Sequence, residues 1–191
     1  MSDAPNRKDV ILLLLALPGR TGRQFEPIAG RTRLMKLLYL LDKEAAIGKR
    51  LDLPSFYSFE AYHYGPFSKD VFDDIEFLRN VGLVRAAPEG SASIAQGDES
   101  AFLIEDETLD NEAHVIGEAL GESAFEEVFA LTPKGEKFVE QKILTFVKDD
   151  AKEAIIKAKT EYASLSLSSL LRYVYRKFPE SATASRLQNL V

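Results

Sequence analysis

The amino-acid sequence predicts a mostly helical α+β fold, with a winged helix-turn-helix core, a small β-wing and extra C-terminal helices. Three observations predict it. Apolar residues recur at helical spacing along much of the chain. The segment 78–84, Leu-Arg-Asn-Val-Gly-Leu-Val, ends one of these helices in a glycine turn and leads into strand-like sequence. The segment 131–133, Leu-Thr-Pro, then begins another helix, so the elements follow the order typical of a winged helix.

Two apolar helices are expected near the N-terminus. Residues 8–17 form a short apolar segment, which Pro18 and Gly19 end. After a loop, a second helix is expected over residues 32–46. Its apolar stripe has helical spacing and consists of Leu34, Leu37, Leu38 and Leu41. Lys36 is the only charged residue between Leu34 and Leu41, which indicates a central core helix.

An aromatic segment and a third helix follow. Residues 56–64 are rich in aromatic side chains and predict a short strand or an extended segment, which Gly65 and Pro66 end. Ser68 is the expected N-cap of a helix that runs to about Asn80. Gly82 stands where a glycine commonly stops a helix.

The predicted wing carries an acidic insertion over residues 86–130, with 12 acidic residues and no Lys or Arg. Its expected strands are residues 102–105 and 127–131, in a hairpin with a long tip. Two interpretations stay open. The insertion is either a solvated loop or an element that engages a basic partner, such as a toxin whose nucleic-acid site it blocks.

The C-terminal third predicts three more helices. Thr132 can cap the first of them, with Pro133 in the first helical position. A lysine-rich helix is expected near residues 148–162, and a last helix begins at Ser168 or Ser166. The apolar stripe of the last helix comprises Leu167, Leu170, Leu171, Val174 and Phe178. We therefore divide the chain into a domain over residues 1–147 and a C-terminal helical extension over residues 148–191.

The composition excludes several kinds of chemistry. Hydrophobic residues make up 46% and charged residues 28% of the 191, as in a soluble globular protein. There is no cysteine, which excludes disulfides and thiol catalysis. His63 and His114 are far apart and lack metal-ligand spacing, and no phosphate-binding glycine loop is present. We expect no enzyme activity, no cofactor and no metal, and a small hydrolase is only a distant alternative.

The first apolar segment superficially resembles an export signal, but its flanking charges and poor cleavage site do not fit one. It is also too short to cross a membrane. The expected location is therefore the cytoplasm, with no membrane partner.

The net charge of −6 conceals an uneven distribution. Residues 1–50 carry net +5, residues 51–131 net −15, and residues 132–191 net +4. In a DNA-binding winged helix, the helix before the wing enters the major groove. Here that helix has two basic residues against four acidic ones, which would repel phosphate.

Two basic clusters are nevertheless candidates for contact with nucleic acid or another anion. One surrounds the start of the second helix, and the other lies on the last helix beside two tyrosines. Together they comprise Arg20, Arg23, Arg31, Arg33, Lys36, Arg172, Arg176 and Lys177. The alternative is that these are solvated charges or ion-pair partners of the acidic segment 51–131. The candidate contacts with a protein partner are Tyr64, Asp70, Asp73 and Asp74.

Four segments together resemble a known family. They are Arg-Thr-Arg-Leu-Met-Lys-Leu-Leu-Tyr-Leu-Leu-Asp (31–42), Tyr-His-Tyr-Gly-Pro-Phe-Ser (62–68), residues 77–84 and Leu-Thr-Pro-Lys-Gly (131–135). These segments resemble the SocA-like antitoxins, which contain the Panacea domain, and the YwgA-type proteins. The similarity spans roughly residues 8–147 by element order. The acidic insertion and the helices from residue 148 onward depart from the compact family pattern.

The resemblance implies a non-catalytic protein that acts as an antitoxin or as an adaptor that hands a toxin to a protease. The expected partner is thus a protein, in a toxin–antitoxin or defence context. The alternative function is a winged-helix transcriptional regulator that binds DNA. The apolar stripe of the last helix must be buried, either within the chain or in a homodimer, and the sequence leaves both open.

Overall fold

The computed structural model describes residues 5–88 and 127–185 and is a mostly helical α+β fold. Its helices are α1 (Arg7–Ala16), α2 (Arg31–Lys43), α3 (Ile47–Arg50), α4 (Lys69–Asn80), α6 (Pro133–Phe138), α7 (Asp149–Tyr162) and α8 (Leu167–Lys177). Its strands are β1 (Ile28–Ala29), β2 (Glu60–Tyr62), β3 (Gly65–Phe67), β4 (Val84–Pro88) and β5 (Glu127–Leu131). A π-helical turn spans Val139–Ile143 and a 3₁₀ turn spans Pro179–Ala182. Within these described residues, no helix combines the length and apolar character that crossing a membrane requires.

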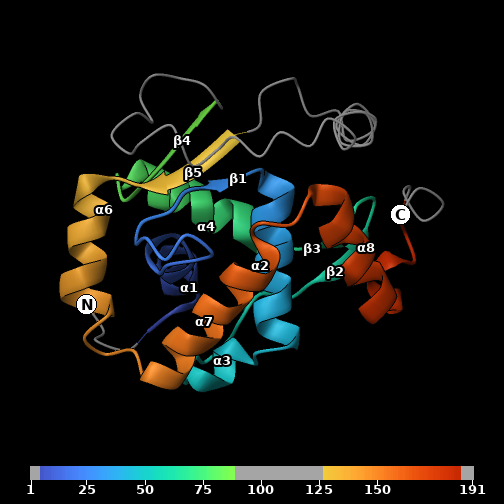
Figure 1. Ribbon diagram of the computed structural model, residues 1–191, viewed down its shortest axis with the longest axis horizontal. Helices are drawn as coiled ribbons and strands as arrows, with labels where there is room; N and C mark the ends of the chain where they lie inside the picture. Colours follow the sequence, from blue (N-terminus) through green and yellow to red (C-terminus); the bar gives the residue numbers. More distant parts are fainter. Residues whose placement is uncertain (1–4, 89–126, 186–191) are drawn as a thin grey trace.

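The strands form two small antiparallel sheets. In the larger sheet the order is β1-β5-β4, with Ile28 opposite Phe129 and Val84 opposite Leu131. The smaller sheet is the hairpin of β2 and β3. Figure 1 shows the larger sheet along one side of the molecule, with the helices gathered beneath it and with α8 and the small hairpin at one end.

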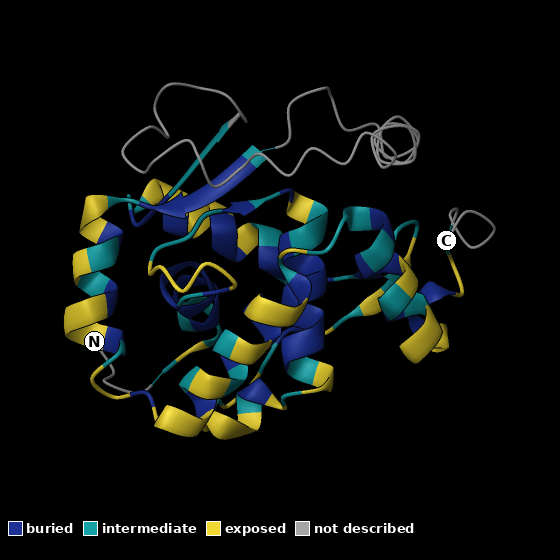
Figure 2. Ribbon diagram, viewed as in Figure 1, coloured by how far each residue is buried: buried dark blue, intermediate teal, exposed yellow. Residues whose placement is uncertain are grey.

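The core surrounds α1 and α2. In α1 every residue from Val10 to Ala16 is buried, because sheet and helices cover it on all sides (Figure 2). The helix starts with a capping box, in which Asn6 accepts a hydrogen bond from a backbone N–H and Asp9 accepts one from the backbone of Asn6. This cap was not predicted. The α2 residues Leu34 to Leu41 are also buried, as expected for a central helix.

The C-terminal helices lie in the same core as the N-terminal ones. Ile155 of α7 and Leu170 and Val174 of α8 are fully buried in the hydrophobic cluster that contains α1 and α2. The apolar stripe of the last helix is therefore buried largely within the chain. This core extends across residue 147, where the sequence suggested a boundary.

Several local predictions are confirmed. Thr132 accepts a hydrogen bond from the N–H of Gly135 at the start of α6. Gly82 has φ of +73° just after α4, as a helix-stopping glycine requires. Of the two candidate N-caps for the last helix, Ser166 has this role, because its hydroxyl accepts from the N–H of Ser169. The predicted strand over residues 102–105 lies outside the described residues.

Other predictions need correction. The aromatic segment 56–64 contains a short strand, one of the two forms expected for it, but only over Glu60–Tyr62. Its last residues form β2 and a tight turn, and Gly65 and Pro66 belong to β3 rather than ending an element. Ser68 precedes α4, but its buried side chain makes no capping hydrogen bond. The helix after Thr132 changes to π-helical geometry at Val139, and the short β1 and α3 were not predicted.

Candidate functional site

Two of the predicted basic contacts are directed into the protein. Lys36 is 3% exposed, and its Nζ donates to the carbonyl oxygen of Pro66 at 3.0 Å. Arg33 donates to the carbonyl oxygens of Ala29 and Ala163, each at 3.1 Å, and to that of Leu165. These two side chains join α2 to the small hairpin and to the end of α7.

The remaining basic residues do not form one surface. Arg20 and Arg23 are exposed in the loop after α1, while Arg172 and Arg176 are exposed on α8. The loop and α8 lie on opposite sides of α2 (Figure 1). Lys177 forms an ion pair with Glu44 at 3.0 Å.

Lys177 and Glu44 belong to a polar network that joins α8 to α7 and to the end of α2. Tyr162 and Tyr173 each donate to the Glu44 carboxylate, at 2.9 and 2.8 Å, and Lys177 donates to Tyr173. Burial and these hydrogen bonds raise the pKa of Tyr162 above its usual value. The network therefore keeps Tyr162 neutral and links three helices.

Two of the predicted acidic contacts pair with the start of α1, and of these Asp74 is buried whereas the Asp70 side chain is 50% exposed. Asp74 is 5% exposed and pairs with Arg7 at 2.7 Å and with Lys8 at 3.4 Å. It also accepts a hydrogen bond from the Tyr57 hydroxyl at 3.1 Å. Asp70 pairs with the same Arg7 at 2.6 Å. Burial, followed by the charge of Asp74, raises the pKa of Tyr57. This cluster attaches α4 to the N-terminal end of α1.

The other two predicted partner contacts differ in exposure. Tyr64 is half-buried against Leu171 of α8, so it is mainly a packing residue. Asp73 is exposed on α4. Glu76 and Phe77 are also exposed on this helix, and the Phe77 side chain is 50% exposed. The surface of α4 is thus both acidic and aromatic.

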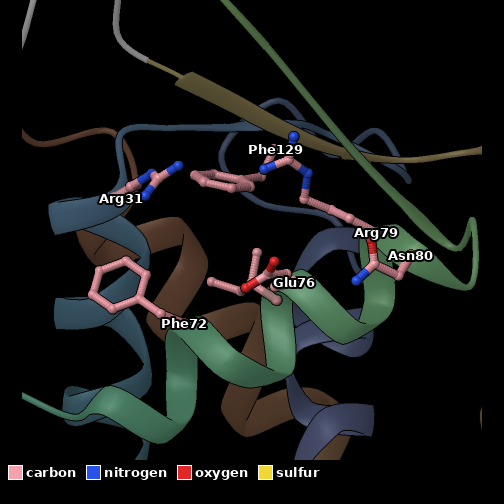
Figure 3. Close-up of a pocket in the computed structure, with 7 residues that line it drawn as sticks. Arg31, Phe72, Glu76, Arg79, Asn80 and Phe129 are labelled. Carbon is pink, nitrogen blue, oxygen red and sulfur yellow. The ribbon is translucent and has the colours of Figure 1, made fainter.

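A pocket of about 500 Å³ lies between α2, α4 and β5 (Figure 3). Its lining consists of Arg31, Phe72, Ile75, Glu76, Arg79, Asn80 and Phe129. Figure 3 shows the guanidinium groups of Arg31 and Arg79 at opposite edges of the Phe129 ring, with Glu76 pointing toward it from α4. The pocket thus combines aromatic side chains and arginines, which are enriched at protein contact sites, with one carboxylate.

Both arginines of this pocket bind one carboxylate. Glu127, the first residue of β5, accepts from Arg31 Nε at 2.5 Å and from Arg79 Nη1 at 3.3 Å. Arg31 also lies over the Phe72 ring, with its guanidinium carbon 5.8 Å from the ring centre. Arg31 is therefore the only predicted basic contact that lines this pocket.

The other lining residues of the pocket were not predicted from the sequence. Arg79 and Glu127 are 48 positions apart, and no local pattern relates them before the sheet and α4 are packed together. The sequence held one weak signal for Arg79, because it is one of only three basic residues in the acidic segment 51–131. Phe129 is in a predicted strand, but its face could not be assigned from the apolar run around it.

No group of three or more potential metal-binding side chains occurs among the residues that the structure describes. His63 is half-buried beside the Tyr62 ring, at 4.3 Å between ring centres. His114 and most of the acidic insertion lie outside the described ranges.

Comparisons with family models, curated proteins and solved structures give no match to this chain.

Proposed function

We propose that this chain is a non-catalytic protein that acts by binding another protein, as an antitoxin or an adaptor, and that its core is a winged helix. The resemblance of residues 31–42 and 62–68 to SocA-like antitoxins supports the first part. The partner would be a toxin or a component of a protease system, met in the cytoplasm.

The topology supports a winged-helix core. With α3 and the β2-β3 hairpin set aside, the order α1-β1-α2-α4-β4-β5 places a strand between the first two helices and a strand pair after α4. The sheet order β1-β5-β4 places the last strand at the centre, as in a winged helix. In this interpretation, α4 is the helix that a DNA-binding relative would place in the major groove.

The surface of α4 is the observation that carries the proposal. Asp73, Glu76 and Phe77 are exposed on this helix. Carboxylates on that surface would repel DNA phosphates, whereas aromatic side chains such as the exposed Phe77 ring are enriched at protein interfaces. The neighbouring pocket adds further aromatic and arginine side chains, the types that contribute most to binding energy at interfaces.

The test is capture of the partner from the native host with the tagged full-length protein. Phe77→Ala should reduce recovery of a specific partner, because it removes the exposed ring from α4. Phe146→Ala is the matched control, since Phe146 is 56% exposed and lies outside α4. If a toxin-like protein is encoded beside this one, cells that express the toxin should stop growing, and co-expression of this protein should restore their growth. Equal recovery with both variants would argue against the α4 surface as the contact.

DNA binding is the second candidate, because Arg172 and Arg176 are exposed on one helix. Duplex binding measured at several salt concentrations decides between the two. The protein-partner proposal expects no binding even at low salt. A salt-dependent affinity that weakens in Arg172→Ala and Arg176→Ala would favour the regulator instead.

A further inference from the structure

The pocket between α2, α4 and β5 already shows which chemical group its arginines bind. In the described parts of the chain, Arg31 and Arg79 converge on the carboxylate of Glu127, although they come from different helices. The Glu127 side chain is 23% exposed, so this contact lies at the edge of the pocket rather than in the core. Two arginines on one carboxylate constitute a preformed carboxylate site.

The arginine pair has unused capacity. A guanidinium has five N–H donors. Among the described residues, Arg31 contacts Glu127 through Nε and Arg79 contacts it through Nη1. The side chains are 53% and 41% exposed, so their other donors are accessible to a ligand. A carboxylate that takes the place of Glu127 could therefore be bound in the bidentate geometry that Arg favours.

The aromatic walls indicate what should accompany the carboxylate. Phe129 lies between the two guanidinium groups but is 1% exposed, so the accessible aromatic wall is Phe72, which lies beneath Arg31 (Figure 3). The centre of the Phe72 ring lies 5.7 Å from that of Phe67, which in turn lies 5.0 Å from that of Tyr62. Tyr62 is 45% exposed. This row provides an apolar surface that leads away from the arginine pair.

We propose that this pocket binds a peptide segment of the protein partner, through a carboxylate that replaces Glu127 on Arg31 and Arg79 and an apolar side chain that packs on Phe72. The inference rests on the proposed function of partner binding. Glu76 and Glu127 balance the two arginines within the pocket. Exchange of one carboxylate for another keeps both arginines paired, and the displaced Glu127, whose side chain is 23% exposed, can be hydrated.

The same charges disfavour single-stranded nucleic acid, which also stacks on aromatic side chains. Such ligands need a positively charged groove that follows successive phosphates. Here the arginines are matched by Glu76 and Glu127, and Asp73 is exposed on the same helix as Glu76. A single carboxylate is thus the better fit than a phosphate chain.

The test uses two small probes of equal shape, N-acetylphenylalanine and its neutral amide, titrated into the full-length protein and followed by NMR. The carboxylate should shift the side-chain N–H signals of Arg31 and Arg79, and the amide should not. Glu127→Gln should tighten carboxylate binding by roughly tenfold, because it removes a charge-assisted competitor worth about one such hydrogen bond. Glu153→Gln is the matched control, since Glu153 is exposed on α7. Its affinity should equal that of the wild type.

Three results would overturn the inference: equal binding of both probes, no binding of either, or a larger shift of the pocket signals by an oligothymidylate. Arg31→Lys and Arg79→Lys keep the positive charge but remove the planar guanidinium that binds a carboxylate through two donors. These variants should therefore lower the affinity for the carboxylate probe. Partner capture separates the two proposals. A partner that these lysine variants retain but Phe77→Ala loses would refute the pocket alone. Probe binding without any captured partner would refute the proposed function alone.

Discussion

Buried charges in this protein are held by groups that are distant in sequence. Lys36 reaches the Pro66 carbonyl, and Lys159, 1% exposed, donates to the carbonyls of Leu17 at 2.8 Å and Glu26 at 3.1 Å. Each such side chain loses hydration on folding and recovers it only through well-placed partners. We therefore expect the loss of a partner to cost more than the loss of an exposed charge.

Asp74→Ala should lower the free energy of unfolding by roughly 2 kcal/mol, because it removes the buried one of the two carboxylates that pair with Arg7 and the carboxylate acceptor of the Tyr57 hydroxyl. Asp73→Ala is the control from the adjacent position, which is exposed, and should change stability by less than about 0.5 kcal/mol. Urea denaturation measures both. Equal effects of the two variants would show that the Asp74 cluster adds nothing to stability.

Lys159 predicts a pH dependence of stability. Burial lowers the pKa of Lys159 from 10.5 in its ordinary state to about 8 in the folded protein. Between these values the unfolded chain binds more protons than the folded one, so the free energy of unfolding contributed by Lys159 rises with pH. From about pH 7.5 to about pH 9.5, the wild type should gain roughly 2 kcal/mol relative to Lys159→Met.

Taking the difference from Lys159→Met removes the contributions of the tyrosines. Tyr57 and Tyr162 have raised pKa values, so their effect has the opposite sign and lowers stability at high pH in both proteins. Urea denaturation at each pH provides the measurement. A difference that stays constant over this range would mean that Lys159 titrates normally in the folded state.

At the scale of elements, the sequence was most informative where a local signal determines the structure. Gly82 and Thr132 end and begin helices through their own backbone and side-chain chemistry, and both were predicted. The two-residue strand β1 was missed, because it exists only through pairing of Ile28 with Phe129. The burial of Arg33 was missed for the same reason, since its acceptors Ala163 and Leu165 are distant in sequence.

Gly135→Ala should destabilise the protein by roughly 2 kcal/mol or more, as overpacking against a rigid neighbour does. A Cβ at this position would lie 2.1 Å from the carbonyl oxygen of Leu83, so α6 or the backbone just before β4 would have to move. Gly48→Ala is the matched control in α3, where a Cβ would meet Phe56 at an ordinary 3.4 Å. That variant should be neutral or slightly stabilising, because Ala favours helices.

Thermal unfolding followed by circular dichroism compares the two alanine variants. The transition temperature of Gly135→Ala should fall by several degrees, roughly 4 °C or more. A transition temperature equal to that of Gly48→Ala would show that the contact between α6 and Leu83 is loose enough to accept a methyl group.

At the scale of the whole molecule, the helices after residue 147 complete the core around α1 and α2. Ile155, Leu170 and Val174 are fully buried there, and Lys159 caps the carbonyl groups that follow α1. A fragment of residues 1–147 would lose these contacts and expose the apolar surfaces of α1 and α2. Each buried aliphatic side chain contributes about 1.5–3 kcal/mol, so three of them approach the total stability of a typical domain, about 5–15 kcal/mol.

The fragment 1–147 should therefore fail to unfold cooperatively, whereas the full chain should show one transition in urea. Circular dichroism follows the transition, and NMR peak dispersion reports whether the fragment retains fixed packing. A cooperative transition and a dispersed spectrum for the fragment would contradict this prediction, and would favour an independent domain over residues 1–147 with an appended helical segment. If the fragment shows neither a cooperative transition nor a dispersed spectrum, the α4 surface depends on the complete core. Partner-binding variants must then be tested in the full-length chain.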